Sequence, residues 1–305
     1  MDIKKVGING SYFHFDSLLN STKQLIDIGF EKIEYSGLSL MDINSYEIEE
    51  LKKILRGEGV TITAVNAVGD LIPVKVGNLI SPQKQERRNG VEHVKKCVDL
   101  AVSLKSKRVV CDIGTSTEDL LPLESQNELF LTSLQEILEY SKSSNVLIVL
   151  MQVPGRRWVP WDGLPPDRSK VVERYIWPWR LWPDEEELLS NLGDKLNGEV
   201  GWAFDAANET VAHGIYRFQL KEVIKPYLNY NLQVVYLANH PGPYNKVWHR
   251  LLLHKPLWNG FYSSQDFRSL LSLSKNKGLS PQITLQIKEK RPKKKSLKRS
   301  LRTVT

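Results

Sequence analysis

Residues 91–114 read VEHVKKCVDLAVSLKSKRVVCDIG, a helical pattern followed directly by a strand pattern. Apolar side chains recur there at the three- and four-residue spacing of one helix face, at Val91, Val94, Val98, Ala101 and Leu104. A short β-rich run extends from Arg108 to Ile113, and Gly114 ends it. A helix that leads within a few residues into a buried strand is the repeating unit of parallel α/β folds.

The same unit recurs along the whole chain. Strand patterns occupy residues 6–9, 32–35, 60–65, 108–113, 146–150, 200–204, 232–237 and 283–287. Helical patterns separate them, at residues 17–27, 47–55, 82–104, 129–141, 184–196, a stretch that reaches about residue 228, and 264–275. Eight such repeats predict a single-domain (β/α)8 TIM barrel over residues 1–287. The alternative is an open doubly wound sheet, but no GxGxxG phosphate turn follows the first strand.

Length and composition agree with a soluble globular domain. The 305 residues suit one barrel of roughly 250 residues with insertions. No stretch approaches the roughly 20 apolar residues of a membrane span, and the first residues lack a signal-peptide core. We therefore expect a cytoplasmic protein. Cys97 and Cys111 belong to no CxxC pair and are interpreted as buried thiols.

The positive charge of the chain is concentrated at its end. The formal net charge is +7, yet residues 288–305 hold nine Lys or Arg and one Glu, a local +8. Residues 1–287 are left with a formal −1, so charge alone indicates no nucleic-acid face on the barrel. Charge runs of this kind are usually disordered, and we expect a flexible tail that contacts polyanions weakly. Alternatively, Leu297, Leu301 and Val304 form a helical stripe.

An insertion follows the fifth strand, at residues 153–183. It holds five of the eight tryptophans, interleaved with five arginines: Trp158, Trp161, Trp177, Trp179 and Trp182, and Arg156, Arg157, Arg168, Arg174 and Arg180. The insertion leaves the strand at the end of a barrel where active sites are built. One interpretation is a lid or a subunit contact. The other is a ligand clamp in which guanidinium groups bind an anion and indoles stack on a sugar or base.

Several segments resemble the xylose isomerase-like barrels, the sugar phosphate isomerase and epimerase group that includes hydroxypyruvate isomerases. They are LIDIGFEKIEYSG (25–37), LKKILRGEGVTITAVNAVGDL (51–71), VEHVKKCVDLAVSLKSKRVVCDIG (91–114), VGWAFDAANETVAHG (200–214) and VVYLANHPGP (234–243). The order and spacing of these segments carry the resemblance, which covers about residues 3–287. It implies a barrel whose site lies at the carboxyl-terminal mouth. In this resemblance, the helical stripe of Leu297, Leu301 and Val304 would take the place of the family's eighth helix.

The resemblance also implies where a metal site would lie. The family holds a divalent metal with a Glu ending strand five, an Asp ending strand six, a His or Gln on strand seven and a Glu on strand eight. The matching positions here are Gln152, Asp205, Tyr236 and Gln286, so only Asp205 keeps the family's residue. Hard divalent cations prefer anionic oxygen ligands. We therefore expect no metal, unless the alignment of the strand ends is shifted.

The remaining candidates are polar groups at the predicted strand ends and residues of the insertion. We assign catalytic roles to Glu34, Gln152, Asp205 and Gln286. The candidate substrate-binding residues are Asn66, Asp112, Arg156, Arg157, Trp158, Asn208, Tyr236, Asn239 and His240. Here Asn208 stands where the family has a His, and Asn239 where it has an Asp-like group.

Three functions remain open at this point. The first is a divergent sugar or sugar phosphate isomerase or epimerase that acts on a small polar or anionic molecule. The second is a non-catalytic binding or scaffold protein on the same barrel. The third is an endonuclease IV-like DNA-repair enzyme, but it needs a cluster of His and carboxylates for zinc, and six scattered histidines do not supply one. Fold alone does not decide among them, and the oligomeric state is also open.

Overall fold

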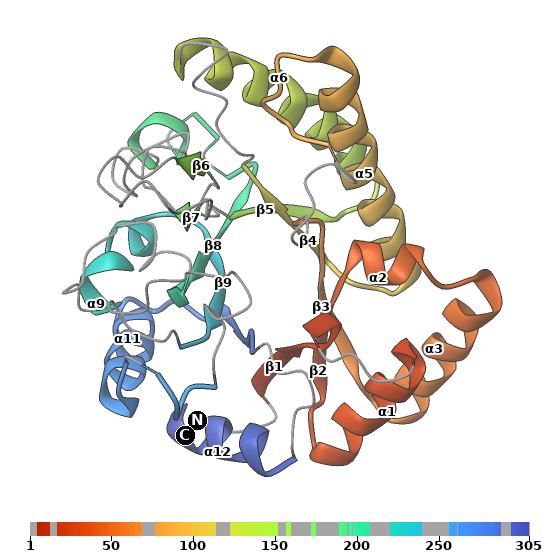
Figure 1. Ribbon diagram of the computed structural model, residues 1–305, viewed down its shortest axis with the longest axis vertical. Helices are drawn as coiled ribbons and strands as arrows, with labels where there is room; N and C mark the ends of the chain where they lie inside the picture. The colour runs from red at the N-terminus through yellow and green to blue at the C-terminus, as the bar shows by residue number, and fades with distance from the viewer. Residues whose placement is uncertain are drawn as a thin grey trace, which may run out of the picture.

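A closed barrel of eight parallel strands forms the centre of the protein (Figure 1). The computed structural model describes residues 5–12, 17–68, 77–113, 123–151, 157–159, 172–174, 189–193, 195–196, 198–207, 220–239, 256–260, 262–287 and 294–304. The barrel strands are β1 (Val6–Asn9), β2 (Lys32–Ser36), β3 (Thr61–Asn66), β4 (Arg108–Asp112), β5 (Leu147–Met151), β8 (Gly201–Asp205), β9 (Leu232–Leu237) and β10 (Gln282–Leu285). They follow one another in chain order around the barrel, and β10 closes it against β1. The predicted (β/α)8 barrel is confirmed.

Helices surround the barrel (Figure 1). They are α1 (Leu18–Ile28), α2 (Gly37–Met41), α3 (Ser45–Gly57), α5 (Lys84–Ser103), α6 (Leu123–Lys142), α9 (Leu220–Val223), α11 (Ser264–Asn276) and α12 (Lys294–Val304). Short 3-10 turns occupy Gly10–Tyr12 and Pro226–Asn229, and a π-helical turn occupies Leu189–Gly193. None of the helices in the described ranges is long and apolar enough to cross a membrane.

Local sequence signals set the helix ends. The side chain of Ser17 accepts a hydrogen bond from the amide of Asn20 and caps α1. That helix ends at Gly29, whose φ of 110° lies in the left-handed region that glycine adopts without strain. Asn44 and Glu47 form a reciprocal capping box at the start of α3. These caps satisfy backbone groups that a helix end otherwise leaves unpaired.

Alternating side chains along the strands divide the core into two parts. One set, which includes Ile33, Val65 and Val109, belongs to the large cluster that also contains the apolar faces of the helices. The other set fills the barrel interior with mostly small side chains: Ala64, Val110, Val149, Met151, Ala203, Val234 and Tyr236. Layers of inward side chains are the normal filling of a TIM barrel. Tyr236 is the one aromatic side chain in this interior cluster of described residues. Its hydroxyl reaches Glu34 on β2, so the side chain extends across the interior.

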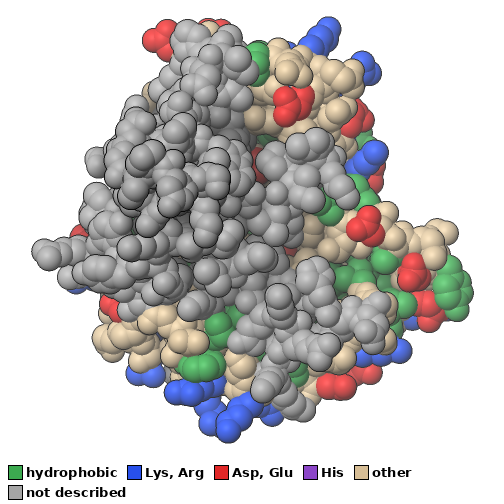
Figure 2. Space-filling view, in the orientation of Figure 1, with side chains coloured by type: hydrophobic (Ala, Val, Ile, Leu, Met, Phe, Trp, Pro, Cys, Tyr) green, Lys and Arg blue, Asp and Glu red, His purple; other side chains and the backbone are tan. Residues whose placement is uncertain are grey.

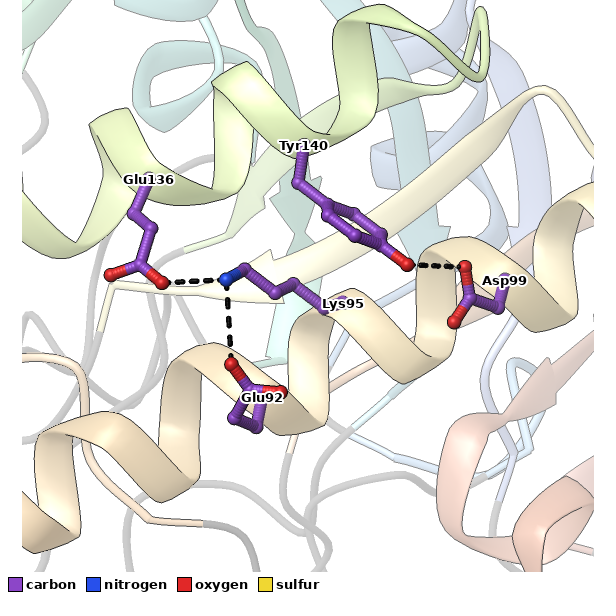
Figure 3. A network of polar contacts seen from close by, with 5 residues as sticks. All are labelled: Glu92, Lys95, Asp99, Glu136 and Tyr140. Atoms are coloured by element: carbon purple, nitrogen blue, oxygen red, sulfur yellow. Dashed lines mark hydrogen bonds and ion pairs between the residues drawn. The ribbon is translucent and has the colours of Figure 1, made fainter.

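Helices α5 and α6 are also joined on the surface (Figure 3). Lys95 lies between Glu136 at 2.5 Å and Glu92 at 3.3 Å, and the hydroxyl of Tyr140 donates to Asp99 at 2.8 Å. The carboxylates are exposed, so each pair contributes at most about 1 kcal/mol. The apolar faces of the two helices supply the larger part of their attachment to the barrel.

The expectation of a flexible tail is wrong for residues 294–304. These residues form α12, which lies between α11 and α1 in Figure 1 and occupies the position of the eighth helix. Leu297 and Leu301 are buried in the core cluster, and the hydroxyl of Ser300 accepts a hydrogen bond from the backbone amide of Leu257. The positive charges do not prevent this because the helix turns Lys295, Lys298, Arg299 and Arg302 outward. The helical stripe, the alternative interpretation, is the correct one.

Candidate functional site

The carboxyl group of Glu34 on β2 is buried beside the carboxyl ends of the two neighbouring strands, β1 and β3. Its Oε1 accepts hydrogen bonds from the side-chain amides of Asn66 at 2.9 Å and Asn9 at 3.2 Å. The hydroxyl of Tyr236 lies 2.9 Å from both carboxyl oxygens. The four side chains that contact one another therefore come from four strands. Asn9 ends β1, Glu34 lies on β2, Asn66 ends β3 and Tyr236 lies on β9. The side chain of Glu34 has no exposed surface.

This environment raises the pKa of Glu34 from the ordinary 4.5 to about 7. Burial is the main cause, because it removes water from the charged form. The hydrogen bonds from Asn66 and Tyr236 lower the pKa in part, and the negative charge of Asp205 raises it further. A carboxyl group with a pKa near 7 exchanges its proton readily at neutral pH, which is the property of a general acid or base.

The hydrogen-bond partners of Glu34 are themselves held in place. The side-chain oxygen of Asn66 accepts the backbone amide of Val68 at 2.9 Å, which turns the amide nitrogen of Asn66 toward Glu34. The side-chain oxygen of Asn9 accepts the backbone amide of Ser11 at 3.1 Å in the same manner. Such supporting contacts fix the donors in advance of any ligand.

Three more of the predicted residues lie at strand ends on the same side of the barrel. Asp205 ends β8, is fully buried, and accepts the backbone amide of Ala207 at 2.9 Å. Gln286 follows β10 and is also buried, while Asp112 ends β4 and is half-buried. The carboxyl ends of parallel barrel strands meet at one rim. The structure therefore brings Glu34, Asn66, Asp205 and Gln286 to one end of the barrel.

Asn239 has a structural role. Its amide nitrogen donates to the backbone oxygens of Leu257 and Tyr262, and its oxygen accepts the backbone amide of Tyr262 at 2.9 Å. A Cβ atom at Gly260 would lie 2.3 Å from the Asn239 side chain, so a glycine is required at this close approach. These contacts attach Leu257 and Tyr262 to the chain just after β9, so Asn239 positions these two residues.

Several predicted site residues lie outside the described part of the chain. These are Gln152, Arg156, Asn208 and His240. Arg157 and Trp158 are described as backbone only, in the short strand β6 (Arg157–Val159), which pairs antiparallel with β7 (Val172–Arg174). The insertion therefore contains a two-stranded hairpin that strand patterns in the sequence did not indicate.

Sequence reasoning missed Asn9 and the direct contact between Tyr236 and Glu34. An inward position of Asn9 follows from the alternation of side chains in the first strand, because a polar residue at the end of a barrel strand faces the mouth. The contact with Tyr236 had no local signal, since 202 residues separate it from Glu34. The sequence predicts a ligand-binding role for Tyr236, whereas in the structure its hydroxyl is hydrogen-bonded to the buried carboxyl group.

The described side chains do not fit the divalent metal that the family implies. At the compared positions Asp205 supplies one carboxylate, Gln286 supplies a neutral amide, and the hydroxyl of Tyr236 is bound to Glu34. Among the described residues no group of three or more His, Cys, Asp or Glu is arranged to hold a metal ion. A hard cation requires more anionic oxygen than this set offers.

Comparison with known proteins agrees with the geometry. Residues 23–164 match the family model of the xylose isomerase-like TIM barrel. The matched stretch, just under half of the chain, is similar to this family. Its structure superimposes on a D-tagatose 3-epimerase-like protein with a TM-score of 0.71 at 19% identity, covering 98% of this chain and 97% of the other. No curated protein matches the sequence.

Two further solved structures illustrate the range of relatives of this barrel. A 3-keto-D-glucoside 4-epimerase from E. coli gives a TM-score of 0.67 at 15% identity, covering 98% of this chain and 99% of that one. The IolI protein, whose structure holds a zinc atom, gives 0.68 at 14% identity, with coverages of 98% and 94%. At such low identity these xylose isomerase-like structures establish the common fold, and the chemistry has to be argued from the site.

Proposed function

We propose that this xylose isomerase-like barrel binds a small, polar, sugar-like molecule at its carboxyl-terminal mouth and transfers a proton at a carbon next to a carbonyl group. This is the chemistry of a sugar isomerase or epimerase. One observation carries the proposal, namely that the Glu34 carboxyl group is buried and held by three neutral donors, Asn9, Asn66 and Tyr236. Structural relatives that are named as sugar epimerases support the substrate class.

The neutral donors explain why Glu34 suits this role. An ion pair with Lys or Arg would hold the carboxylate ionised and lower its basicity. Neutral amide and hydroxyl groups orient the carboxyl group while burial raises its pKa to about 7. Near pH 7 both protonation states are then populated, so the same group accepts a proton in one step and returns it in the next.

The proposed step balances without a co-reactant. The bond between the acidic carbon and its hydrogen breaks, the proton passes to a carboxyl oxygen of Glu34, and the electron pair moves to the carbonyl oxygen to give an enediolate. Reprotonation at the neighbouring carbon gives the isomer, while the hydroxyl proton of the first carbon moves to the enediolate oxygen. Reprotonation of the original carbon on the opposite face gives the epimer. The amide of Gln286, in the place of a carboxylate, supplies a neutral donor for the developing oxyanion. Asp205 is the second candidate acid or base.

Exchange of substrate hydrogen for deuterium tests this function. The protein is incubated in D2O with a panel of ketopentoses and ketohexoses, and loss of the signal of the hydrogen next to the carbonyl is followed by ¹H NMR. We expect exchange with the wild type, and a loss of at least 100-fold in Glu34→Gln, which keeps the size of the side chain but cannot accept the proton. Glu58→Gln, at an exposed carboxylate, is the matched control and should exchange normally.

The pH profile provides an independent readout. The hydrogen bond from Tyr236 lowers the pKa of Glu34, so Tyr236→Phe should raise that pKa and shift the rising limb of the exchange rate to higher pH. If Glu34→Gln exchanges substrate hydrogen as fast as the Glu58→Gln control, Glu34 is not the base. A profile of Tyr236→Phe that shifts to lower pH contradicts the assignment as well.

The second candidate function is a binding or scaffold protein without catalysis. The replacement of the family's ligand positions by Tyr236 and Gln286, and by Gln152 in the sequence, favours it. The same experiment separates the two functions. A sugar that binds in calorimetry but shows no exchange at any pH indicates a binding protein, whereas exchange that depends on Glu34 indicates an enzyme.

A further inference from the structure

A cavity of about 590 Å³ lies at the amino-terminal end of the barrel, opposite the site of Glu34. It is formed where β4, β5 and β9 begin and by the segment that precedes β8, because its lining includes Arg108, Leu147, Gln233 and Glu199. The carboxyl end of α6 supplies the remaining wall, including Lys142. Neither the proposed catalytic residues nor the basic helix α12 contribute to it.

The charges around this cavity are unbalanced. Three cationic side chains line it, those of Lys107, Arg108 and Lys142, against one carboxylate, that of Glu199. Lys107 and Lys142 are exposed and can move, whereas Arg108 is half-buried, and burial lowers its pKa. A guanidinium group loses part of its hydration at such a position. An anionic ligand would offset the free-energy cost of that lost hydration.

Arg108 is held toward the cavity by a chain of side-chain hydrogen bonds. Its Nε donates to the side-chain oxygen of Gln233 at 3.2 Å, and the amide nitrogen of Gln233 donates to the side-chain oxygen of Asn231 at 2.6 Å. Asn231 in turn donates to the backbone oxygen of Val200 at 3.1 Å. In this arrangement Gln233 binds one edge of the guanidinium group through Nε. Among the described residues, no hydrogen bond involves its two terminal nitrogens.

We propose that this cavity is a second ligand site, which binds the phosphate group of a small phosphorylated molecule. Arg108 presents a planar pair of donors that matches two phosphate oxygens, and the exposed Lys107 and Lys142 add positive charge to the same cavity. Leu138, Val146 and Leu147 provide apolar surface for the organic part of a phosphate ester. The volume exceeds that of a single phosphate ion, which favours an ester over free phosphate. The site does not depend on the proposed activity at the mouth.

Calorimetric titration of the full-length protein at low ionic strength tests the proposal, with inorganic phosphate and glycerol 3-phosphate as probes. We expect both to bind, with the ester at least threefold tighter. The double variant Lys107→Gln/Lys142→Gln should weaken both at least tenfold, and Arg108→Gln should abolish binding. The control Lys23→Gln/Lys275→Gln, which removes the same charge from exposed sites on α1 and α11, should leave affinity unchanged.

Each outcome bears on the proposal. Equal affinity for the two probes would assign the site to the phosphate group alone, and the dependence on Lys107 and Lys142 would still support it. The proposal is overturned if neither probe binds, if the Lys107/Lys142 variant binds as well as the wild type, or if the Lys23/Lys275 control loses affinity equally. Because Lys107 and Lys142 are exposed, their variant should fold even if Arg108→Gln does not. Glu34→Gln should bind both probes normally, which separates this site from the mouth.

Discussion

At the scale of single residues, the molecule is distinguished by a carboxyl group that it keeps away from water. Glu34 lies among neutral partners, and its pKa of about 7 means that the folded state holds a proton that the unfolded state releases near pH 4.5. The unfolded chain therefore binds fewer protons between these two pH values, and stability falls as the pH rises through that window. Most buried residues do not make stability depend on pH in this way. A buried carboxyl group that lowers stability at neutral pH is typical of a functional site.

Glu34→Gln should remove this pH dependence. Between pH 4.5 and pH 7 the wild type should lose about 3 kcal/mol of unfolding free energy relative to the variant, because a shift of one pKa unit corresponds to about 1.4 kcal/mol. Below pH 4.5 and above pH 7 the difference should be constant. Urea unfolding of both proteins from pH 4 to pH 8 measures it. Parallel stability curves would show that Glu34 has an ordinary pKa.

At the scale of elements, α12 shows how a strongly basic segment becomes part of a core. Its apolar residues repeat at a spacing of four, so Leu297 and Leu301 share the face that packs on the barrel, while the cations lie on the other faces. Arg299 lies 4.3 Å from the ring centre of Trp258, which adds a cation–π contact at the edge. In Figure 2, Lys and Arg side chains gather at the lower edge of the molecule, where α12 lies in Figure 1.

The burial of α12 leads to a stability prediction. Leu297→Ala or Leu301→Ala should each lower the unfolding free energy by about 2–5 kcal/mol, because each leaves a cavity in a packed core. Lys298→Ala, on the exposed face of the same helix, should change it by less than about 0.5 kcal/mol. Chemical denaturation measures all three. Leucine variants as stable as Lys298→Ala would mean that α12 contributes nothing to the fold in solution.

The exposed face of α12 should bind polyanions weakly. Lys295, Lys298 and Arg302 present fixed positive charge, and neutralising phosphates releases counterions. Fluorescence anisotropy with a labelled 20-nucleotide single-stranded DNA should show binding that falls steeply with salt. Replacing these three residues by glutamine should abolish the binding, whereas replacing Lys23, Lys53 and Lys275 should not. Binding that survives the first set and is lost with the second would place the contact elsewhere.

At the scale of the whole molecule, the barrel brings polar side chains from the ends of distant strands to one rim. The described groups there include the carboxylates of Asp205 and Asp112, the neutral Gln286 and Tyr236, and a Glu34 engaged by hydrogen bonds. Small inward side chains fill the described barrel interior, so the fold itself does not depend on a bound ligand.

We predict that the purified protein holds no stoichiometric divalent metal, and that Gln152→Glu/Gln286→Glu raises its affinity for Mn²⁺ or Zn²⁺ at least tenfold by adding anionic oxygen. Elemental analysis and calorimetry measure this. Gln282→Glu, on the same strand β10 but bound to Lys32 at the other end, is the matched control and should bind no metal. One tightly held metal per wild-type chain, lost in Asp205→Ala, would overturn the prediction.

The sequence by itself determined the eight strands, the order of the barrel and most of the helices between them. Within the predicted helix 184–196, the described residues form only the π-helical turn Leu189–Gly193. Each strand pattern falls within one or two residues of an observed strand, because β-branched runs, helix caps and glycine stops act over a few residues. The positions of Glu34, Asn66, Asp205 and Gln286 followed from the same patterns, since strand ends meet at one rim. These features depend on local chemistry and on a closure rule that all such barrels share.

Only the tertiary structure decided how those residues interact. The hydroxyl of Tyr236 reaches Glu34 across a barrel interior that holds small side chains such as Ala64 and Ala203, and no local pattern encodes that fit. The tertiary structure also decided between a flexible tail and a helix at the end of the chain. Helix α12 is stabilised because Leu297 and Leu301 are buried in the core cluster. In both cases the deciding free energy comes from contacts between segments distant in sequence, and it appears only after the barrel has closed.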